Sequence, residues 1–286
     1  PVMRLADKVV VPSGFLVDVF KRFGLQAAAV FNVVDMEMFA YRDRDVLRPV
    51  FLSNRNLEAL YNVGCILTAF GKIQRRYPDA RLIVAGDGKQ REALKRKARD
   101  LGLRNTEFVG QVSPPRMSEL YREADIYLNS SNIDNMPGSI LESFSSGLPV
   151  VTTDAGGIPY IVKNEETGLM VRCGDADGLA ASAIRLLEDV GLARRLTRKA
   201  RSECVRYSWS AVRDEWVGLY ARLAARPEWN NFAPSAGHSR DSALLRAKRK
   251  SPVNLSGCIA AEHTYSSTNS GDSSQSGDET LAGDPA

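Results

Sequence analysis

Two carboxylates lie on either side of a predicted helix start. Asp134 and Glu142 are eight positions apart, and Pro137 and Gly138 stand between them. A helix that begins near Pro137 directs free backbone N–H groups and the positive end of its dipole at an anion. A ribose hydroxyl can reach Glu142, more than one turn inside that helix, and a sugar can reach Asp134 in the loop before it. The pattern predicts a nucleotide-sugar site.

A structural interpretation of the same residues is available. Asp is a favoured helix N-cap residue, so Asp134 can simply cap the helix, and Glu142 can be a solvated helix residue. The surrounding residues favour the functional interpretation, because a helix of small residues and a buried strand at 149–153 follow at once.

This segment resembles the signature of the retaining, nucleotide-sugar-dependent family 4 glycosyltransferases, which have the GT-B fold. Glu142 takes the place of the second Glu of that signature, and Gly147-Leu148-Pro149-Val150-Val151 matches the strand after it. Weaker similar segments follow the family's order at 80–88, 108–110, 124–128, 154–159 and 167–171. The resemblance covers residues from about 48 to 225.

The resemblance implies a nucleotide-diphosphate sugar as donor, with no cofactor and no metal ion. Arg55 is assigned to the donor diphosphate, because a guanidinium binds phosphate oxygens bidentately and keeps its charge. Asp134 is assigned to hydroxyls of the transferred sugar and Glu142 to the ribose. The predicted catalytic residues are Asp134 and Arg55; the predicted donor-binding residues are Arg55, Val112, Asp134, Pro137, Gly138, Ser139, Ile140 and Glu142.

Two of these assignments rest on backbone groups. The N–H groups of Gly138, Ser139 and Ile140 are expected to face the diphosphate or the sugar. Val112 is expected to line the base pocket through its backbone, with packing at the sheet edge as the alternative. The pair Gly156 and Gly157 is interpreted as a tight turn before 158–159.

The chain departs from the family pattern at two positions. Asp134 replaces a Glu, and Leu60 stands where the family carries a phosphate-binding Lys five positions after the Arg. Two outcomes are open. Arg55, Asn54 or Asn62, together with the helix start, can replace the missing phosphate-binding Lys, or donor binding is weakened.

Strand-like runs alternate with amphipathic stretches, which predicts a parallel α/β sheet covered on both faces, a Rossmann-like doubly wound domain. Strands are expected at 9–11, 50–53, 82–85, 107–109, 126–129 and 150–153, and helices at 57–76, 90–101, 114–121 and 208–223, with two more between 176 and 207 broken near Gly191. In such a sheet ligands bind at the carboxyl ends of the strands. Arg55, residues 110–112 and residues 134–138 each follow a strand, so we expect them at one edge.

The predicted organisation has four parts. Residues 1–46 resemble the end of an N-terminal acceptor domain and its linker, most of that domain being missing, and residues 47–208 the donor-binding domain. Residues 209–225 form a closing helix that returns to the N-terminal domain, and residues 226–286 a disordered tail. A basic cluster at 246–250 can touch an anionic membrane, although a solvated charge run is the favoured interpretation.

Composition narrows the function classes. A net charge of +4 gives no argument for nucleic acid, and the sequence carries neither a signal peptide nor an apolar run long enough to span a bilayer. The four cysteines are scattered without metal-ligand spacing, which fits a reducing cytoplasm. Both histidines, His238 and His263, fall in the tail, which argues against a His-based metal site or catalysis in the folded part.

Three functions remain open from the sequence. The first is a sugar transferase of which this chain is mostly the donor half. The second is a non-catalytic nucleotide-sugar binding module, which the departures at Leu60 and Asp134 favour. The third, a GT-B phosphorylase or epimerase, is disfavoured because no pyridoxal-phosphate lysine motif and no catalytic His are visible. The sugar, the base and the acceptor are left undetermined.

Overall fold

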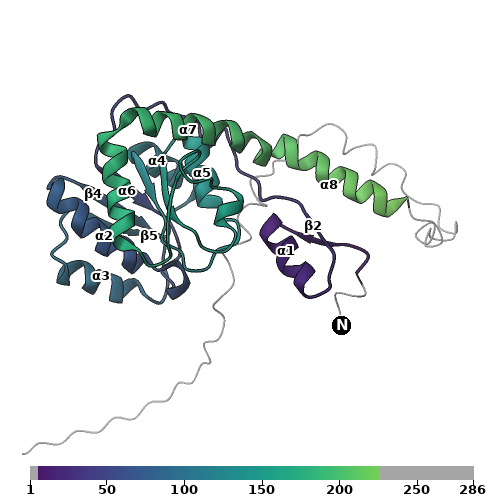
Figure 1. The fold of residues 1–286 in the computed structure, drawn as a ribbon, viewed down its shortest axis with the longest axis horizontal. Coiled ribbons are helices and arrows are strands. Elements are labelled where there is room, and N and C mark those ends of the chain that lie inside the picture. Colours follow the sequence, from purple (N-terminus) through teal and green to yellow (C-terminus); the bar gives the residue numbers. More distant parts are fainter. Residues whose placement is uncertain (1–5, 226–286) are drawn as a thin grey trace, which may run out of the picture. The chain divides into compact units, whose positions relative to one another are not determined.

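The computed structural model describes residues 6–225, so the predicted tail and its basic cluster lie outside the described residues. Its main element is a six-stranded sheet in the order β5-β4-β3-β6-β7-β8, in which every neighbouring pair is parallel. Figure 1 shows this sheet with helices packed around it. The strands are β3 (Val50–Ser53), β4 (Arg81–Ala85), β5 (Thr106–Gly110), β6 (Ile126–Leu128), β7 (Val150–Thr153) and β8 (Leu169–Val171). The predicted α/β class with a doubly wound parallel sheet is confirmed.

Helices cover both faces of this sheet because its strands are apolar on both sides. Phe51 of β3 packs with one set of helices, α2 (Val63–Arg76), α3 (Arg91–Asp100) and α6 (Ala176–Glu188). Its neighbour Leu52 points the other way, to α4 (Pro114–Glu123) and α5 (Gly138–Ser146). Successive strand residues face opposite sides, so fully buried strands are continuous apolar runs.

Several predicted boundaries are corrected. The helix expected from 57 begins only at Val63, because the chain first makes a short 3-10 helix, Ala59–Tyr61, and Asn62 is left-handed with φ 46°. The predicted break near Gly191 lies at Asp189, whose side chain accepts from the N–H of Leu192 (2.8 Å) and starts α7 (Val190–Cys204). Strands β2 (Ala27–Ala29) and β8 were not expected as strands: β2 consists of three alanines, which are depleted in strands, and β8 is a short strand at the sheet edge.

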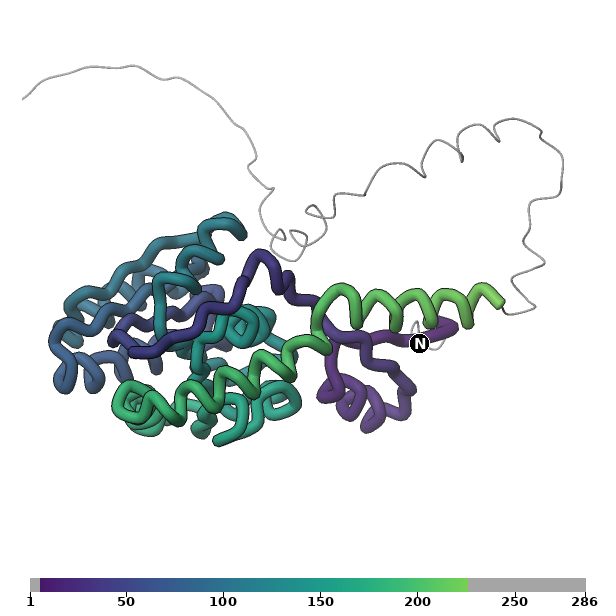
Figure 2. The backbone as a smooth tube through the Cα atoms, turned by 90° about the horizontal axis from the view of Figure 1, so that it is seen from above, coloured from purple at the N-terminus to yellow at the C-terminus, as the bar shows by residue number. Residues whose placement is uncertain are grey.

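The N-terminal residues form a separate small unit of secondary structure. It comprises β1 (Val9–Val11), α1 (Gly14–Arg22) and β2 (Ala27–Ala29), and β1 and β2 pair in parallel with each other. Helix α8 (Trp209–Ala224), green in Figure 2, and the purple N-terminal unit lie on the same side of the large sheet. The segment after β2 touches the turn before α8, because the N–H of Val34 donates to the carbonyl of Tyr207 (2.9 Å) and the ring of Phe31 meets that of Tyr207 edge-on.

The strand order places a switch point between β3 and β6. After β3 the chain adds β4 and β5 on one side, then returns to place β6, β7 and β8 on the other. β3 and β6 are neighbours in the sheet. The loop after β3 leads toward β4 on one side, and the loop after β6 leads toward β7 on the other side. Such a point forms a crevice at the carboxyl ends of the strands and is where open α/β sheets bind ligands.

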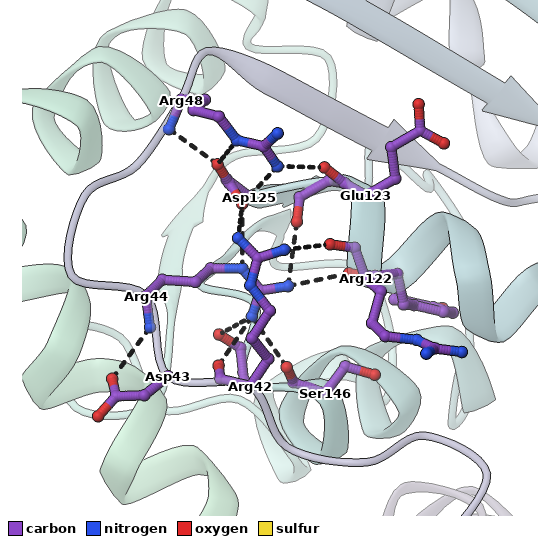
Figure 3. Close-up of polar contacts among 11 residues, drawn as sticks. Arg42, Asp43, Arg44, Arg48, Arg122, Glu123, Asp125 and Ser146 are labelled. Atoms are coloured by element: carbon purple, nitrogen blue, oxygen red, sulfur yellow. Dashed lines mark hydrogen bonds and ion pairs between the residues drawn. The ribbon is translucent and has the colours of Figure 1, made fainter.

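Residues 38–48, called the strap below, bind the end of the sheet opposite the switch point, at the amino ends of the strands. They do so through one buried carboxylate. Asp125 is fully buried just before β6, and its two oxygens pair with Arg44 (3.2 Å), Arg48 (2.8 Å) and Arg42 (3.3 Å) (Figure 3). Of the three guanidinium groups only that of Arg44 is buried, with 3% of its side chain exposed. Arg44–Asp125 is thus the buried ion pair, and the other two arginines flank it.

Arg44 also ties two helix ends together. Its terminal nitrogens donate to the carbonyls of Tyr121 and Ala124 at the end of α4, and to those of Ser146 and Gly147 at the end of α5 (2.9–3.0 Å). A cation at a helix C-terminus is favourable, because the last carbonyls lack partners within the helix. Burial, with repulsion from Arg42, lowers the pKa of Arg44 to about 10 despite Asp125, so the group is still charged at neutral pH.

Replacing Asp125 with Ala is expected to lower the free energy of unfolding by about 3–5 kcal/mol, because it leaves the buried charge of Arg44 without its partner. Urea unfolding followed by circular dichroism measures this. Asp177→Ala is the control, since Asp177 pairs with Lys72 at the surface and such pairs contribute little. Equal stability of the two variants would contradict the role given to Asp125.

Candidate functional site

Arg55 and Asp134 meet at the switch point. Arg55 lies two residues after β3, Asp134 lies in the loop between β6 and α5, and their side chains form an ion pair of 3.0 Å. Both are largely enclosed, with 15% and 6% of the side chain exposed. The structure therefore brings the two predicted catalytic residues together, and the expected convergence at one edge of the sheet holds for them.

The guanidinium of Arg55 is held from three directions. It stacks over the ring of Tyr61, 4.3 Å from the centroid, and one nitrogen lies 3.5 Å from the hydroxyl of Ser139 in α5. The third partner is Asp134. The Nε atom is buried, and no described residue accepts its hydrogen bond. Because a carboxylate already offsets part of its charge, Arg55 offers an anion a weaker field than a free guanidinium.

The loop that carries Asp134 is fixed by its own contacts rather than by a capping role. One carboxylate oxygen accepts from the hydroxyl of Ser131 (3.0 Å) and the other from the N–H of Asn135 (3.0 Å). The N-cap of α5 is Pro137, so the alternative in which Asp134 caps the helix is not the one found. The carboxylate is thus oriented by Arg55 and its neighbours.

The predicted glycine turn supports this loop directly. The N–H of Gly157 donates to the carbonyl of Asp134 (2.9 Å), and a side-chain carbon at Gly156 or Gly157 would overlap the carbonyl oxygens of Asp134 and Asn135. Gly156 also has φ +48°, where residues with a side chain are strained. The two glycines therefore do more than form a turn, because their lack of side chains leaves room for the loop that carries Asp134.

The start of α5 faces open space. No described side chain caps it, and a carbon added to Gly138 would meet no atom within 4 Å. The N–H groups of the first turn point away from the helix body, and Gly138 and Ser139 begin that turn. The expectation for Ile140 is corrected, because its N–H donates to the carbonyl of Pro137 (3.1 Å) and its side chain is fully buried. Ile140 therefore contributes packing rather than a free N–H.

Glu142 lies one turn further along α5, and a tyrosine holds its carboxylate. The hydroxyl of Tyr121, at the end of α4, lies 2.7 Å from Oε2 of Glu142, and Asn54, next to Arg55, donates to the same hydroxyl (2.9 Å). Sequence reasoning missed Tyr121, because the contact joins two helices 21 positions apart. Its one signal in the sequence was its place on a predicted helix that leads directly into β6.

The remaining predicted positions lie around this centre. Leu60 is 40% exposed, and its carbonyl accepts from the N–H of Asn132 (2.8 Å) in the loop before Asp134. Asn62 donates to the side chain of Asn132 (3.3 Å). Val112 is half-buried after β5, two strands away from β3 at the sheet edge. The structure thus places Leu60 beside the site and Val112 at its far end.

Two further features concern the described residues as a whole. Within residues 6–225, no three His, Cys, Asp or Glu side chains are grouped in a way that can hold a metal ion, and the expectation of metal independence stays a prediction. No helix in that range is long and apolar enough to cross a membrane.

The comparisons with known proteins agree with one another on the family. The model of the family "Glycosyl transferases group 1" matches residues 38–203. Phosphatidyl-myo-inositol mannosyltransferase of Mycolicibacterium smegmatis is 30% identical over 209 residues, which are 70% of this chain and 53% of that protein. Glycogen synthase of Mycobacterium tuberculosis is 32% identical over 172 residues, 59% of this chain and 41% of that protein. The chain spans about half the length of such relatives.

Solved structures share the fold. Sucrose-phosphate synthase from Thermosynechococcus elongatus superposes with a TM-score of 0.69 at 23% identity, covering 77% of this chain and 59% of that one. Anabaena Alr3699/HepE in complex with UDP-glucose gives a TM-score of 0.69 at 19% identity, covering 76% of this chain and 64% of that one. These likenesses confirm the predicted GT-B type of α/β architecture.

Proposed function

The chain belongs to the group 1 glycosyl transferases, and from this premise we propose that it binds a nucleotide-diphosphate sugar at the switch point between β3 and β6. The observation that carries the proposal is the meeting there of three groups: the cation of Arg55, the uncapped start of α5, and the half-buried carboxylate of Glu142. They match the diphosphate and the ribose of one ligand. A protein of the same fold, Anabaena Alr3699/HepE, has been solved in complex with UDP-glucose.

The proposed reaction is transfer of the sugar to an acceptor hydroxyl, with retention of configuration as in family 4. The bond between the anomeric carbon and the diphosphate oxygen breaks, a bond to the acceptor oxygen forms, and the acceptor proton is released. Arg55 and the N–H groups of Gly138 and Ser139 stabilise the charge on the departing diphosphate. Asp134 binds hydroxyls of the transferred sugar. We propose that no metal ion or cofactor takes part, and that the reaction takes place in the cytoplasm.

The ion pair between Arg55 and Asp134, present without a donor, has two consequences for donor binding. The carboxylate keeps the guanidinium turned toward the start of α5, where a diphosphate would lie. The carboxylate of Asp134 also offsets part of the positive charge of Arg55, so a diphosphate must compete with Asp134 for the guanidinium. Together with an apolar Leu60, this predicts a diphosphate site that is well oriented but weak.

The ribose assignment is tested by calorimetric titration of the full chain with UDP, GDP, UDP-glucose and GDP-mannose. Glu142→Ala is expected to weaken binding at least tenfold, because one hydrogen bond to a charged group contributes about 1.5–3 kcal/mol. Glu119→Ala, an exposed Glu on α4 that pairs with Arg116, should bind like the wild type. Unchanged affinity in Glu142→Ala, with an intact far-ultraviolet spectrum, would refute the assignment.

The position of Leu60 provides a second test. Leu60→Lys places an ammonium five residues after Arg55, and we expect it to raise nucleotide-diphosphate affinity about tenfold through one added charge-assisted contact. Leu101→Lys is the matched control, because Leu101 is a similarly exposed leucine (43%) at the end of α3. A Leu60→Lys protein that gains no more affinity than Leu101→Lys would show that this position does not face the diphosphate.

The alternative function, a binding module without catalysis, is favoured by Leu60 and by the shorter carboxylate of Asp134. Donor hydrolysis separates the two, because a catalytic site can pass the sugar to water when no acceptor is present, whereas a binding module leaves the donor intact. We expect the wild type to release sugar from the donor that it binds, and Asp134→Asn to lose this release. Donor binding without any release from the wild type would support the binding module instead.

A further inference from the structure

The phenol of Tyr121 is a buried polar group that contacts both the loop after β3 and helix α5, the two sides of the candidate site. It lies 2.7 Å from Oε2 of Glu142 and 3.0 Å from the carbonyl of Ser139, both in α5, and it contacts Asn54 after β3. The side chain is fully buried. These two elements, β3 and α5, supply the proposed diphosphate and ribose contacts.

The direction of these hydrogen bonds follows from the chemistry of the groups. A phenol has one hydrogen to donate, and the charged acceptor at the shorter distance takes it, so Tyr121 donates to Glu142. The amide of Asn54 donates to the phenol oxygen, which completes a chain from the Arg55 loop to Glu142. Burial, with the neighbouring charge of Glu142, raises the pKa of Tyr121 well above its usual value, so the phenol keeps the hydrogen that it donates.

The position of the phenol is set from the strap. Phe39 packs edge-on against the ring of Tyr121, with 5.4 Å between centroids and 83° between planes. Arg44 donates to the backbone carbonyl of Tyr121 (2.9 Å) while it pairs with Asp125. The ring of Tyr121 is therefore held by Phe39 and its backbone by Arg44, while its hydroxyl contacts Glu142 at the site.

We infer that Tyr121 is a positioning residue that holds the carboxylate of Glu142 in the orientation required to bind the donor's ribose. The inference rests on the proposed function, because it requires Glu142 to read a ribose hydroxyl. A carboxylate on a helix surface otherwise samples several rotamers, and fixing it in advance reduces the entropy that binding costs.

The experiment compares ribose discrimination in Tyr121→Phe with that of the wild type. The dissociation constants of UDP and GDP, and of their 2′-deoxy and 3′-deoxy forms, are measured by calorimetry on the full chain. We expect the wild type to prefer a ribose form about tenfold, and Tyr121→Phe to reduce that preference to within about twofold. Tyr207→Phe is the matched control, since Tyr207 is also buried and its hydroxyl contacts Arg206.

A double variant separates positioning from general loosening. If Tyr121 acts through Glu142, Tyr121→Phe causes no further loss of ribose preference in a Glu142→Gln background. Additive losses, or an unchanged preference in Tyr121→Phe, would overturn the inference while leaving the proposed function intact. A folded wild type that binds no nucleotide would overturn both. Should Tyr121→Phe not fold, Asn54→Ala interrupts the same chain of hydrogen bonds and is expected to lower the preference in the same direction.

Discussion

Asp125 is the constraint on which the rest of this structure depends. A carboxylate buried without partners is very costly, so Asp125 is compatible with the fold only when the arginines of the strap reach it. Arg44 reaches it between the ends of α4 and α5, whose carbonyls it also binds. One charge requirement thus fixes the strap, two helices and the start of β6 relative to one another.

The site at the opposite end of the sheet inherits its geometry from this arrangement. When the C-terminal ends of α4 and α5 are fixed, Tyr121 and Glu142 face each other, and the N-terminal end of α5 is held at the switch point. The ion pair between Arg55 and Asp134 then joins the loop after β3 to the loop after β6. The glycines at 156 and 157 contribute by leaving room for the loop that carries Asp134.

Much of this could be predicted from the sequence, because it follows from local pattern. Short runs that begin with apolar residues located β3 and β7, and because Arg55 and the loop at 134–138 each follow a strand of a parallel sheet, they were expected to converge at one edge. Contacts between distant segments were not predictable in this way: the Arg55–Asp134 pair and the Tyr121–Glu142 hydrogen bond depend on side-chain directions that no spacing encodes. The late start of α2 and the internal hydrogen bond of Ile140 depend on backbone geometry that residue type leaves open.

The central claim is that one ligand spans Arg55, the start of α5 and Glu142. A crystal structure of the full chain with the nucleoside diphosphate that binds best tests it most directly. The account predicts phosphate oxygens within hydrogen-bonding distance of Arg55 and of the N–H groups of Gly138 and Ser139, and a ribose hydroxyl on Glu142. A nucleotide bound elsewhere, or one whose ribose faces away from Glu142 while its phosphates miss the start of α5, would contradict it.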